Sequence, residues 1–173
     1  GVQASIVIPT FNRLAALRRV LAALAQQWRP PGVEVEVVVV DDGSTDGTSE
    51  WLRSSSAPLS RVLTQDNTGP AAARNRGVAA AGGELVLFLG DDTVPQPGWL
   101  AAHLEDHRLF GGDGGLAVLG YTSFPSAMDS PFRRFINEFG AQFGYALIDD
   151  PCAVPFNFFY TSNVSLPRSE FTR

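Results

Sequence analysis

The first 90 residues alternate between short apolar runs and helical patterns, and this alternation restricts the folds that the chain can adopt. An apolar run of this length bounded by turn residues is typical of a buried strand, whereas leucines at three- and four-residue spacing line one face of a helix. The strands are expected at residues 4–10, 33–42, 61–66 and 84–90, and the helices at 12–25, 46–52 and 69–83. This β-α-β-α-β-α-β order predicts an α/β fold with a Rossmann-like, mainly parallel sheet and helices on both faces.

Pairs of aspartates follow two of the predicted strands. Asp41 and Asp42 end the second strand, and Asp91 and Asp92 follow the fourth. Ligands of such sheets bind beyond the carboxyl ends of the strands, so the architecture places all four acids at the ligand edge. Adjacent carboxylates repel each other unless a cation or hydrogen-bond donors compensate. Each pair therefore needs a compensating partner.

The second pair suits a divalent cation. Mg²⁺ and Mn²⁺ prefer oxygen ligands and take one or two carboxylates together with substrate phosphates. Two acids alone hold such an ion weakly, so we expect metal affinity to depend on a diphosphate ligand. The first pair, within "DDGSTDGT", is not an EF-hand, because Arg53 stands where a bidentate Glu is required, and Ser44 replaces the second acid of a phosphatase-like motif. The alternative interpretation of this segment is a strand-to-helix turn in which Asp46 or Thr45 caps the helix.

Three other features of the first half bear on a ligand. Arg74 and Arg76 face different sides of the predicted third helix, so one of them at most points at the ligand edge. Gly69 permits a close approach of the backbone before that helix, whose first amides favour an anion. Phe11 follows the first strand, where it either stacks on a ligand ring or packs in the core.

The pattern is less regular beyond Trp99. We expect helices at 99–110 and 130–147, a strand at 116–121, a glycine-rich turn at 111–115 and a last strand at the end of 153–166. His103 and His107 share one face of the first of these helices, and without a third ligand we expect them at the surface. The aromatic residues of 132–145 are expected to form core or an oligomer contact, with an acceptor-binding or membrane-facing surface as the alternative.

Composition excludes several classes of function. A length of 173 residues with 45% apolar and 18% charged residues is typical of one globular domain. The net charge of −5 and the lack of a Lys/Arg run argue against nucleic acid. No apolar stretch approaches the roughly 18 to 20 residues of a membrane span, and the start lacks the basic residues of a signal peptide. With the single Cys152, this favours the cytoplasm, and association with a membrane surface stays open.

Four segments in this order resemble the family 2 glycosyltransferases of the GT-A fold: "SIVIPTFNR", "VVVVDDGSTDGT", "GPAAARNRGVAAAGGELVLFLGDDTVP" and "TSNVSLPR". The resemblance covers nearly the whole chain. It implies transfer of a sugar from a nucleoside diphosphate donor, such as a UDP or GDP sugar, to an acceptor hydroxyl with inversion at the anomeric carbon. The acceptor would be a glycan, a lipid-linked molecule or a small molecule, as in polysaccharide or cell-envelope biosynthesis, and a homo-oligomer is compatible with it.

The resemblance also implies roles for individual residues. The loop around the base would contain Phe11, Asp42 would hydrogen-bond the base with Asp41 as its supporting neighbour, and Arg74 would lie near the donor. Asp91 would point toward the sugar or ribose, and Asp92 would bind the Mg²⁺ or Mn²⁺. The complete set implied for the nucleotide sugar is Pro9, Thr10, Phe11, Asp41, Asp42, Arg74 and Asp91.

The chain departs from the family pattern in two places. Gly90 replaces the first acid of the family's Asp-x-Asp motif, and the segment that carries the family's general base would follow Arg173. We therefore expect one GT-A domain, truncated at its C-terminus, with a nucleotide-binding half at 1–98 and the start of an acceptor half at 99–173. Two alternatives remain: a catalytically silent nucleotide-sugar-binding module, and a sugar nucleotidyltransferase, which usually has a Gly-rich phosphate loop where this chain reads "PTFNRLAAL".

Overall fold

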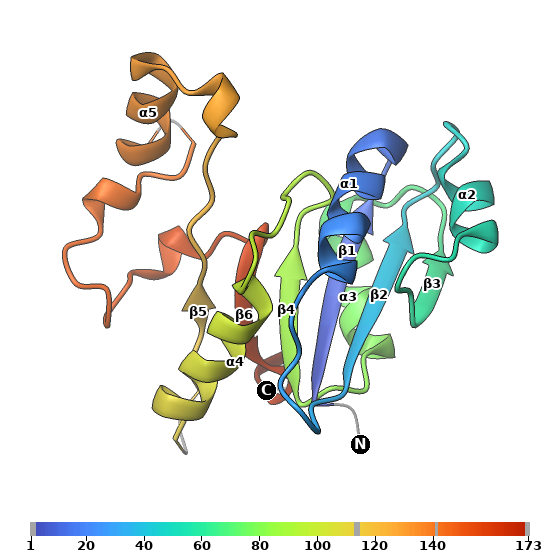
Figure 1. The fold of residues 1–173 in the computed structure, drawn as a ribbon, viewed down its shortest axis with the longest axis horizontal. Coiled ribbons are helices and arrows are strands. Elements are labelled where there is room, and N and C mark those ends of the chain that lie inside the picture. The colour runs from blue at the N-terminus through green and yellow to red at the C-terminus, as the bar shows by residue number, and fades with distance from the viewer. Residues whose placement is uncertain (1–2, 113–114, 141, 172–173) are drawn as a thin grey trace.

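A twisted sheet forms the centre of the protein (Figure 1). The structure is a computed structural model that describes residues 3–112, 115–140 and 142–171. The described residues form a six-stranded sheet in the order β3-β2-β1-β4-β6-β5. The first four strands run parallel, and β6 is antiparallel to both β4 and β5. The mainly parallel α/β sheet is thus confirmed, with strands β1 (Ala4–Thr10), β2 (Val35–Asp41), β3 (Arg61–Thr64), β4 (Leu85–Leu89), β5 (Val118–Leu119) and β6 (Asn163–Pro167).

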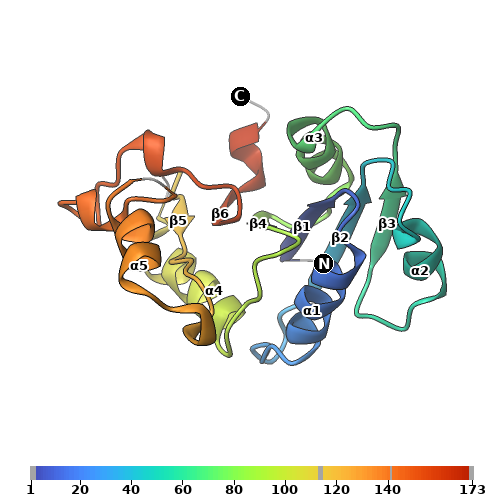
Figure 2. The same ribbon diagram turned by 90° about the horizontal axis from the view of Figure 1, so that it is seen from above.

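Helices cover both faces of this sheet, as predicted. Figure 2 shows α3 (Pro70–Ala80) on one face and α1 (Leu14–Ala25) with α4 (Trp99–Phe110) on the other. Alternate residues of β1 serve the two layers, since Ile6 and Ile8 pack with α1 while Val7 packs against α3. Every residue of β1, β2 and β4 is buried, which explains why these segments are continuously apolar over most of their length.

Gly77 sets the spacing between α3 and the sheet. A Cβ atom at this position would lie 2.4 Å from Val7 Cγ1 and 3.2 Å from Val40 Cγ2, so only a glycine lets the helix approach this closely. The tight packing fixes the N-terminal turn of α3 beside the carboxyl ends of β1 and β2.

Hydrogen bonds between the loops after β1 and β2 cap the first two helices. Asn12, which precedes α1, does not cap it, because its Oδ1 atom accepts a hydrogen bond from the backbone N–H of Thr45 (2.7 Å). The N–H of Leu14, the first residue of α1, donates to Asp46 Oδ2 (3.0 Å). Asp46 Oδ1 also accepts from the N–H of Thr48, where α2 (Thr48–Ser54) begins (3.1 Å). The loops after β1 and β2 therefore hold each other, a long-range contact that sequence spacing does not reveal.

The second half of the chain differs more from expectation. The helix predicted at 130–147 is confined to α5 (Pro131–Glu138), because the chain turns at Gly140 (φ 102°) and Gly144 (φ 76°), conformations that only glycine adopts readily. Three-residue 3₁₀ turns occur at Tyr145–Leu147 and Phe156–Phe158. The strand predicted at 116–121 is reduced to β5, and two residues of the 111–115 turn, 113 and 114, lie outside the described residues. Figure 1 shows α5 standing away from the sheet.

The prediction of two surface histidines on α4 is wrong. His103 is only 3% exposed, and its ring lies between Ser165 Oγ (2.7 Å from Nδ1) and Asn163 Oδ1 (3.1 Å from Nε2) of β6. His107 is half-buried and approaches the same Ser165 hydroxyl through Nε2 (2.9 Å). The antiparallel strand β6 supplies these partners.

No helix in the described part of the chain combines the length and the apolar content that crossing a bilayer requires.

Candidate functional site

A pocket of about 490 Å³ opens at the carboxyl ends of β1, β2 and β4. Its position is the one that the fold predicts for a ligand, because the loops that follow parallel strands meet at this edge. Seven of the eight residues predicted for the site line it, and Asp41 does not. The lining consists of Pro9, Thr10, Phe11, Arg13, Asp42, Asn67, Gly69, Pro70, Arg74, Gly90, Asp91, Asp92 and Ser162.

Arg13 is the partner that compensates the second pair of acids in this structure. Its Nη1 atom lies 3.7 Å from Asp91 Oδ1 and forms an ion pair with Asp92 Oδ2. Thr10 Oγ1 donates a further hydrogen bond to Asp91 Oδ2 (2.9 Å). Burial raises the pKa of the Asp91 carboxyl, and the contacts with Thr10 and Arg13 offset this only in part. Sequence reasoning missed Arg13, although its place just after β1 puts it at the same edge as the acids.

Asp42 ties the loop before α3 to the end of β2. Its Oδ1 atom accepts hydrogen bonds from Gln65 Nε2 (2.7 Å) and the N–H of Thr68 (3.0 Å), and its Oδ2 atom accepts from the N–H of Gly69 (2.9 Å). Burial raises the pKa of this carboxyl, but the three hydrogen bonds outweigh it, and the pKa lies below its ordinary value. Asp42 is therefore ionised at neutral pH while it lines the pocket.

Asp41 has a different position from the other predicted residues. It is fully buried, and its carboxylate accepts hydrogen bonds from the N–H of Ser44 (3.0 Å) and from the Ser49 hydroxyl. These bonds hold the turn that follows β2. Asp41 thus lies behind the pocket wall.

Arg74 provides a positive charge without a complete set of partners. Its side chain lines the pocket, and its Nε atom is buried with no hydrogen-bond partner among the described residues. Burial lowers the pKa of the guanidinium, while the nearby Asp91 raises it. Arg76, two residues further along α3, is exposed and donates to the carbonyl of Thr64 (2.8 Å). As helical spacing predicts, only Arg74 of the two faces the pocket.

The acid pair has the donor chemistry for a divalent cation but does not complete its shell. Carboxylate oxygens suit Mg²⁺ and Mn²⁺, yet no cluster of three or more His, Cys, Asp or Glu side chains exists within residues 3–112, 115–140 and 142–171. Gly90 cannot simply be replaced by the missing acid, because its Cβ atom would lie 2.8 Å from Thr93 Oγ1. An ion at Asp91 and Asp92 would therefore need oxygens from a ligand, and the residues present fit such an ion.

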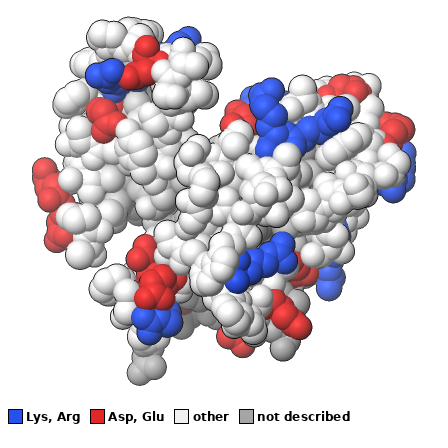
Figure 3. Space-filling view, viewed as in Figure 1, with Lys and Arg blue, Asp and Glu red and all other residues white. Residues whose placement is uncertain are grey.

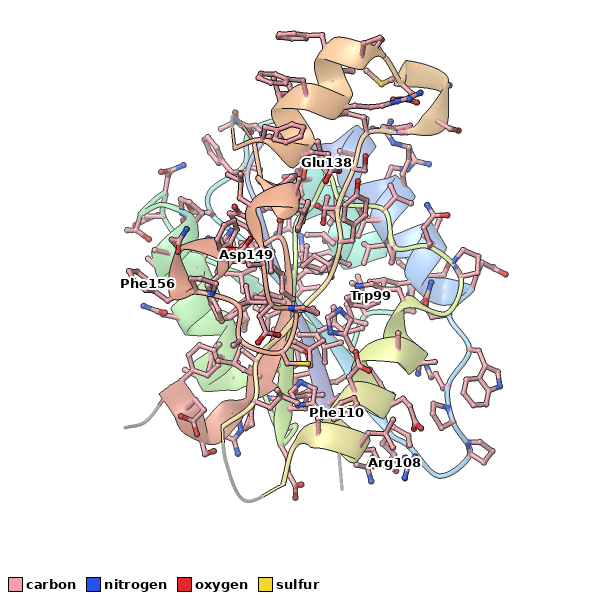
Figure 4. The ribbon with its side chains drawn as sticks, turned by 90° about the vertical axis from the view of Figure 1, so that its left-hand side faces the viewer. Trp99, Arg108, Phe110, Glu138, Asp149 and Phe156 are labelled. Carbon is pink, nitrogen blue, oxygen red and sulfur yellow. The ribbon has the colours of Figure 1, made fainter. Side chains whose placement is uncertain are left out.

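The later acids that could serve as a base lie outside the pocket lining. Glu138 Oε1 accepts a hydrogen bond from the Tyr121 hydroxyl (2.5 Å), and Asp150 Oδ1 accepts one from the N–H of Cys152 (2.8 Å). Asp149 is exposed. Figure 4 shows Glu138 and Asp149 on the segments that stand apart from the sheet.

The sequence relatives of the chain are glycosyltransferases. Validoxylamine A glucosyltransferase of Streptomyces hygroscopicus subsp. limoneus is 32% identical over 194 aligned positions, which cover 98% of this chain and 42% of that protein. Chondroitin synthase of Escherichia coli is 31% identical over 137 positions, covering 78% of this chain and 19% of that protein. The chain therefore spans less than half the length of these relatives.

Two of the solved structures that resemble it are complexes with a nucleotide sugar. S. aureus TarS 1-349 in complex with UDP-GlcNAc has a TM-score of 0.60 and 29% identity, covering 75% of this chain and 37% of TarS 1-349. The mannosyltransferase PcManGT from Pyrobaculum calidifontis, in complex with GDP-Man and Mn²⁺, has a TM-score of 0.53 and 29% identity, covering 60% of this chain and 31% of that one. The fold is GT-A. Residues 5–115 match the model of the family described as Glycosyl transferase family 2, and the chain belongs to that family.

Proposed function

We propose that this chain is the donor-binding domain of an inverting glycosyltransferase, which transfers a sugar from a nucleoside diphosphate sugar to an acceptor hydroxyl with the help of a divalent cation. The observation that carries this proposal is the pocket at the carboxyl edge, which is lined by the Arg74 side chain together with two adjacent carboxylates, Asp91 and Asp92. A diphosphate with a bound cation satisfies all three groups at once. The complexes of TarS with UDP-GlcNAc and of PcManGT with GDP-Man and Mn²⁺ support it.

The pocket residues divide by chemistry. Phe11, which is 43% exposed, offers a ring face to the base, and Asp42 offers a carboxylate to a base N–H. Arg74 contributes its guanidinium charge to a diphosphate in the pocket. Asp91, held by Thr10, lies where it can accept hydrogen bonds from a ribose or sugar hydroxyl. We assign the nucleotide to residues 1–98, with Ser162 from 99–173 completing the wall.

Asp92 is the residue that we propose as the main protein ligand of the Mg²⁺ or Mn²⁺. Its side chain is more exposed than that of Asp91, and it forms an ion pair with Arg13 in this structure. When bound, the cation would neutralise the negative charge that develops on the departing diphosphate. Arg13 would then be free to turn from Asp92 to a phosphate oxygen, because its side chain is half exposed.

The general base and the acceptor lie beyond this donor pocket. Asp42 is committed to three hydrogen bonds. We assign Asp91 to a ribose or sugar hydroxyl and Asp92 to the cation. We propose that the base belongs to sequence that follows Arg173, a proposal supported by relatives more than twice as long as this chain. We further propose that the acceptor is a glycan, a lipid-linked molecule or a small molecule. We propose that the protein acts in the cytoplasm. The silent sugar-binding module stays as the alternative, because no further acid of the described residues lines the pocket.

Calorimetry with UDP and GDP, with Mn²⁺ or with EDTA, tests the proposal. Arg74→Gln is expected to weaken binding of the preferred nucleotide by at least about tenfold, roughly 1.4 kcal/mol, whereas Arg76→Gln on the same helix leaves it unchanged. Asp92→Asn is expected to remove the dependence on Mn²⁺. Equal affinities in Mn²⁺ and EDTA would refute the metal role, and an absence of nucleotide binding would refute the function.

Release of UDP or GDP from its sugar conjugate in the presence of acceptor separates the enzyme from the silent module. The 173-residue chain is expected to bind the donor with little turnover, because removal of a carboxylate base typically lowers the rate by about 10²- to 10⁴-fold. A version extended past Arg173 is expected to gain activity. Inactivity of the extended version would favour the binding module.

A further inference from the structure

A tyrosine beside the donor pocket has the placement expected of an acceptor-binding residue. Because β6 is antiparallel to both β4 and β5, the chain leaves β5 at the same edge of the sheet at which β4 ends. The N–H of Gly120 donates to the carbonyl of Asn163 (2.9 Å), and Asn163 Nδ2 donates to the carbonyl of Tyr121 (3.2 Å). The neighbour of Asn163 in the chain is Ser162, which lines the pocket. Tyr121 is thus connected to the pocket wall through Asn163.

Tyr121 is exposed and yet fixed in place. The residue is 61% exposed, but its hydroxyl donates to Glu138 Oε1 (2.5 Å) and accepts from Asn137 Nδ2 (3.2 Å). Its ring packs against that of Tyr145, with centroids 4.7 Å apart. An exposed aromatic ring that is held at its hydroxyl and by a neighbouring ring has a defined orientation toward solvent.

The residues behind Tyr121 form a rigid support. The Tyr145 hydroxyl accepts from the N–H of Thr122 (3.0 Å) and donates to the carbonyl of Gly120 (3.3 Å). The rings of Phe143 and Tyr160 pack against Tyr145, with centroids 5.3 Å and 5.9 Å away. These contacts fix both ends of the segment that carries Tyr121.

Two polar side chains beside the Tyr121 ring can accept further hydrogen bonds. Asn137 is 1% exposed, and its Oδ1 atom has no hydrogen-bond partner among the described residues, which is unfavourable for a buried acceptor. Glu138 brings a carboxylate, which is a strong acceptor for hydroxyl groups. Figure 4 shows Glu138 at the end of α5 that faces the sheet, and Figure 3 shows the surface hollowed between the α5 region and the rest of the molecule.

We propose that Tyr121 and Glu138 form a subsite for a sugar ring of the acceptor, in which the apolar face of the ring stacks on Tyr121 and a ring hydroxyl donates to Glu138. A pyranose has a face of C–H groups and a rim of hydroxyls, so it is matched by an aromatic face with a carboxylate at its edge. The inference rests on the proposed function, because a sugar bound here is an acceptor only if the adjoining pocket holds a donor. Among the acceptors considered above, it selects one that carries a sugar ring.

The test uses saturation-transfer NMR on the 173-residue chain with UDP and Mn²⁺ present. The probes are the methyl glycosides of glucose, mannose and N-acetylglucosamine. At least one is expected to bind saturably, with its ring C–H protons receiving the strongest transfer. Tyr121→Ala is expected to weaken that binding at least about fivefold, because it removes the aromatic face on which the sugar ring stacks. Glu138→Gln, which leaves the ring in place, is expected to weaken it about threefold through loss of a charge-assisted bond.

Phe156→Ala is the matched control, because Phe156 is 92% exposed and takes no part in the subsite. This variant is expected to bind the glycoside with the affinity of the wild type. Circular dichroism and UDP affinity verify that each variant is folded. Failure of all three glycosides to bind, or equal binding by Tyr121→Ala, would overturn the subsite. The donor pocket is judged separately by UDP binding, so a chain that binds UDP but no glycoside refutes only this inference.

Discussion

Replacement of Asp42 by asparagine should separate its two roles, in the loop and in the pocket. The carboxylate gathers three donors from residues 65–69, two on Oδ1 and one on Oδ2. An asparagine keeps one acceptor oxygen, and its NH₂ group must face at least one of these donors. If the amide oxygen stays with Gln65 and Thr68, the N–H of Gly69 loses its partner in a site where Asp42 is 3% exposed.

The expected loss follows from these contacts. One hydrogen bond to a charged group is lost, at about 1.5–3 kcal/mol, and the other two become neutral and weaker. We therefore expect Asp42→Asn to be about 2–4 kcal/mol less stable, which with a urea dependence of about 2–3 kcal/mol per M lowers the unfolding midpoint by roughly 1 M. The pKa of Asp42 is lowered in the folded state, so its contribution is full above the ordinary aspartate pKa of about 3.9 and is lost as the pH falls through the lowered value.

Urea unfolding at pH 7 and at about pH 3, with and without UDP, measures both roles. Asp66→Asn is the control, because Asp66 is an exposed acid of the same loop. If Asp42 contacts the base, the affinities of Asp42→Asn for UDP, GDP and ADP are expected to differ less than those of the wild type, at concentrations of urea where the variant is folded. Equal unfolding midpoints for Asp42→Asn and the wild type would refute the hydrogen-bond argument, and unchanged discrimination would move base recognition to another residue.

Two further predictions concern the scaffold around the site. Gly77→Ala should lower the free energy of unfolding, measured in urea, by about 1–3 kcal/mol, because its Cβ would collide with Val7. Gly82→Ala is the control and should stay near the wild type, because its Cβ would lie 3.5 Å from Glu36 Oε1. Equal losses in the two variants would contradict the packing argument. Burial lowers the pKa of His103, so stability should be full above about pH 6.5 and fall below it by up to about 1.4 kcal/mol per pH unit. Thermal melts from pH 8 to pH 5 measure this, and a slope unaltered in His103→Asn would assign the effect to other groups.

The architecture and the pocket were predictable from the sequence because both follow from local patterns. Continuous apolar runs between helical segments indicate parallel strands, and parallel strands bring their following residues to one edge. This is why Asp42 and Asp91, far apart in the chain, line the same pocket. Helical spacing was enough to predict that at most one of Arg74 and Arg76 lines the pocket, and the family resemblance selected Arg74.

The errors arose where contacts between distant segments decide the outcome. Asp46 caps a helix that precedes it by a whole strand, and Arg13 meets the acids only once β1 and β4 pair. His103 is buried by β6, which follows it by some sixty residues. The length of α5 depended on two glycines whose positive φ angles no helical periodicity predicts.

The pairing of β4 with β6 has a consequence for how the protein folds as it is synthesised. β4 is apolar and buried throughout, and one of its edges is covered only by β6, with Leu89 opposite Asn163. Strands β1 to β4 can assemble as soon as they leave the ribosome, but the outer edge of β4 then stays bare until residues 163–167 emerge. An uncovered apolar strand edge is a template for pairing with another chain. The nascent protein is therefore most prone to aggregation while residues 99–162 are being made, and a fragment that ends at residue 98 would keep that edge exposed permanently.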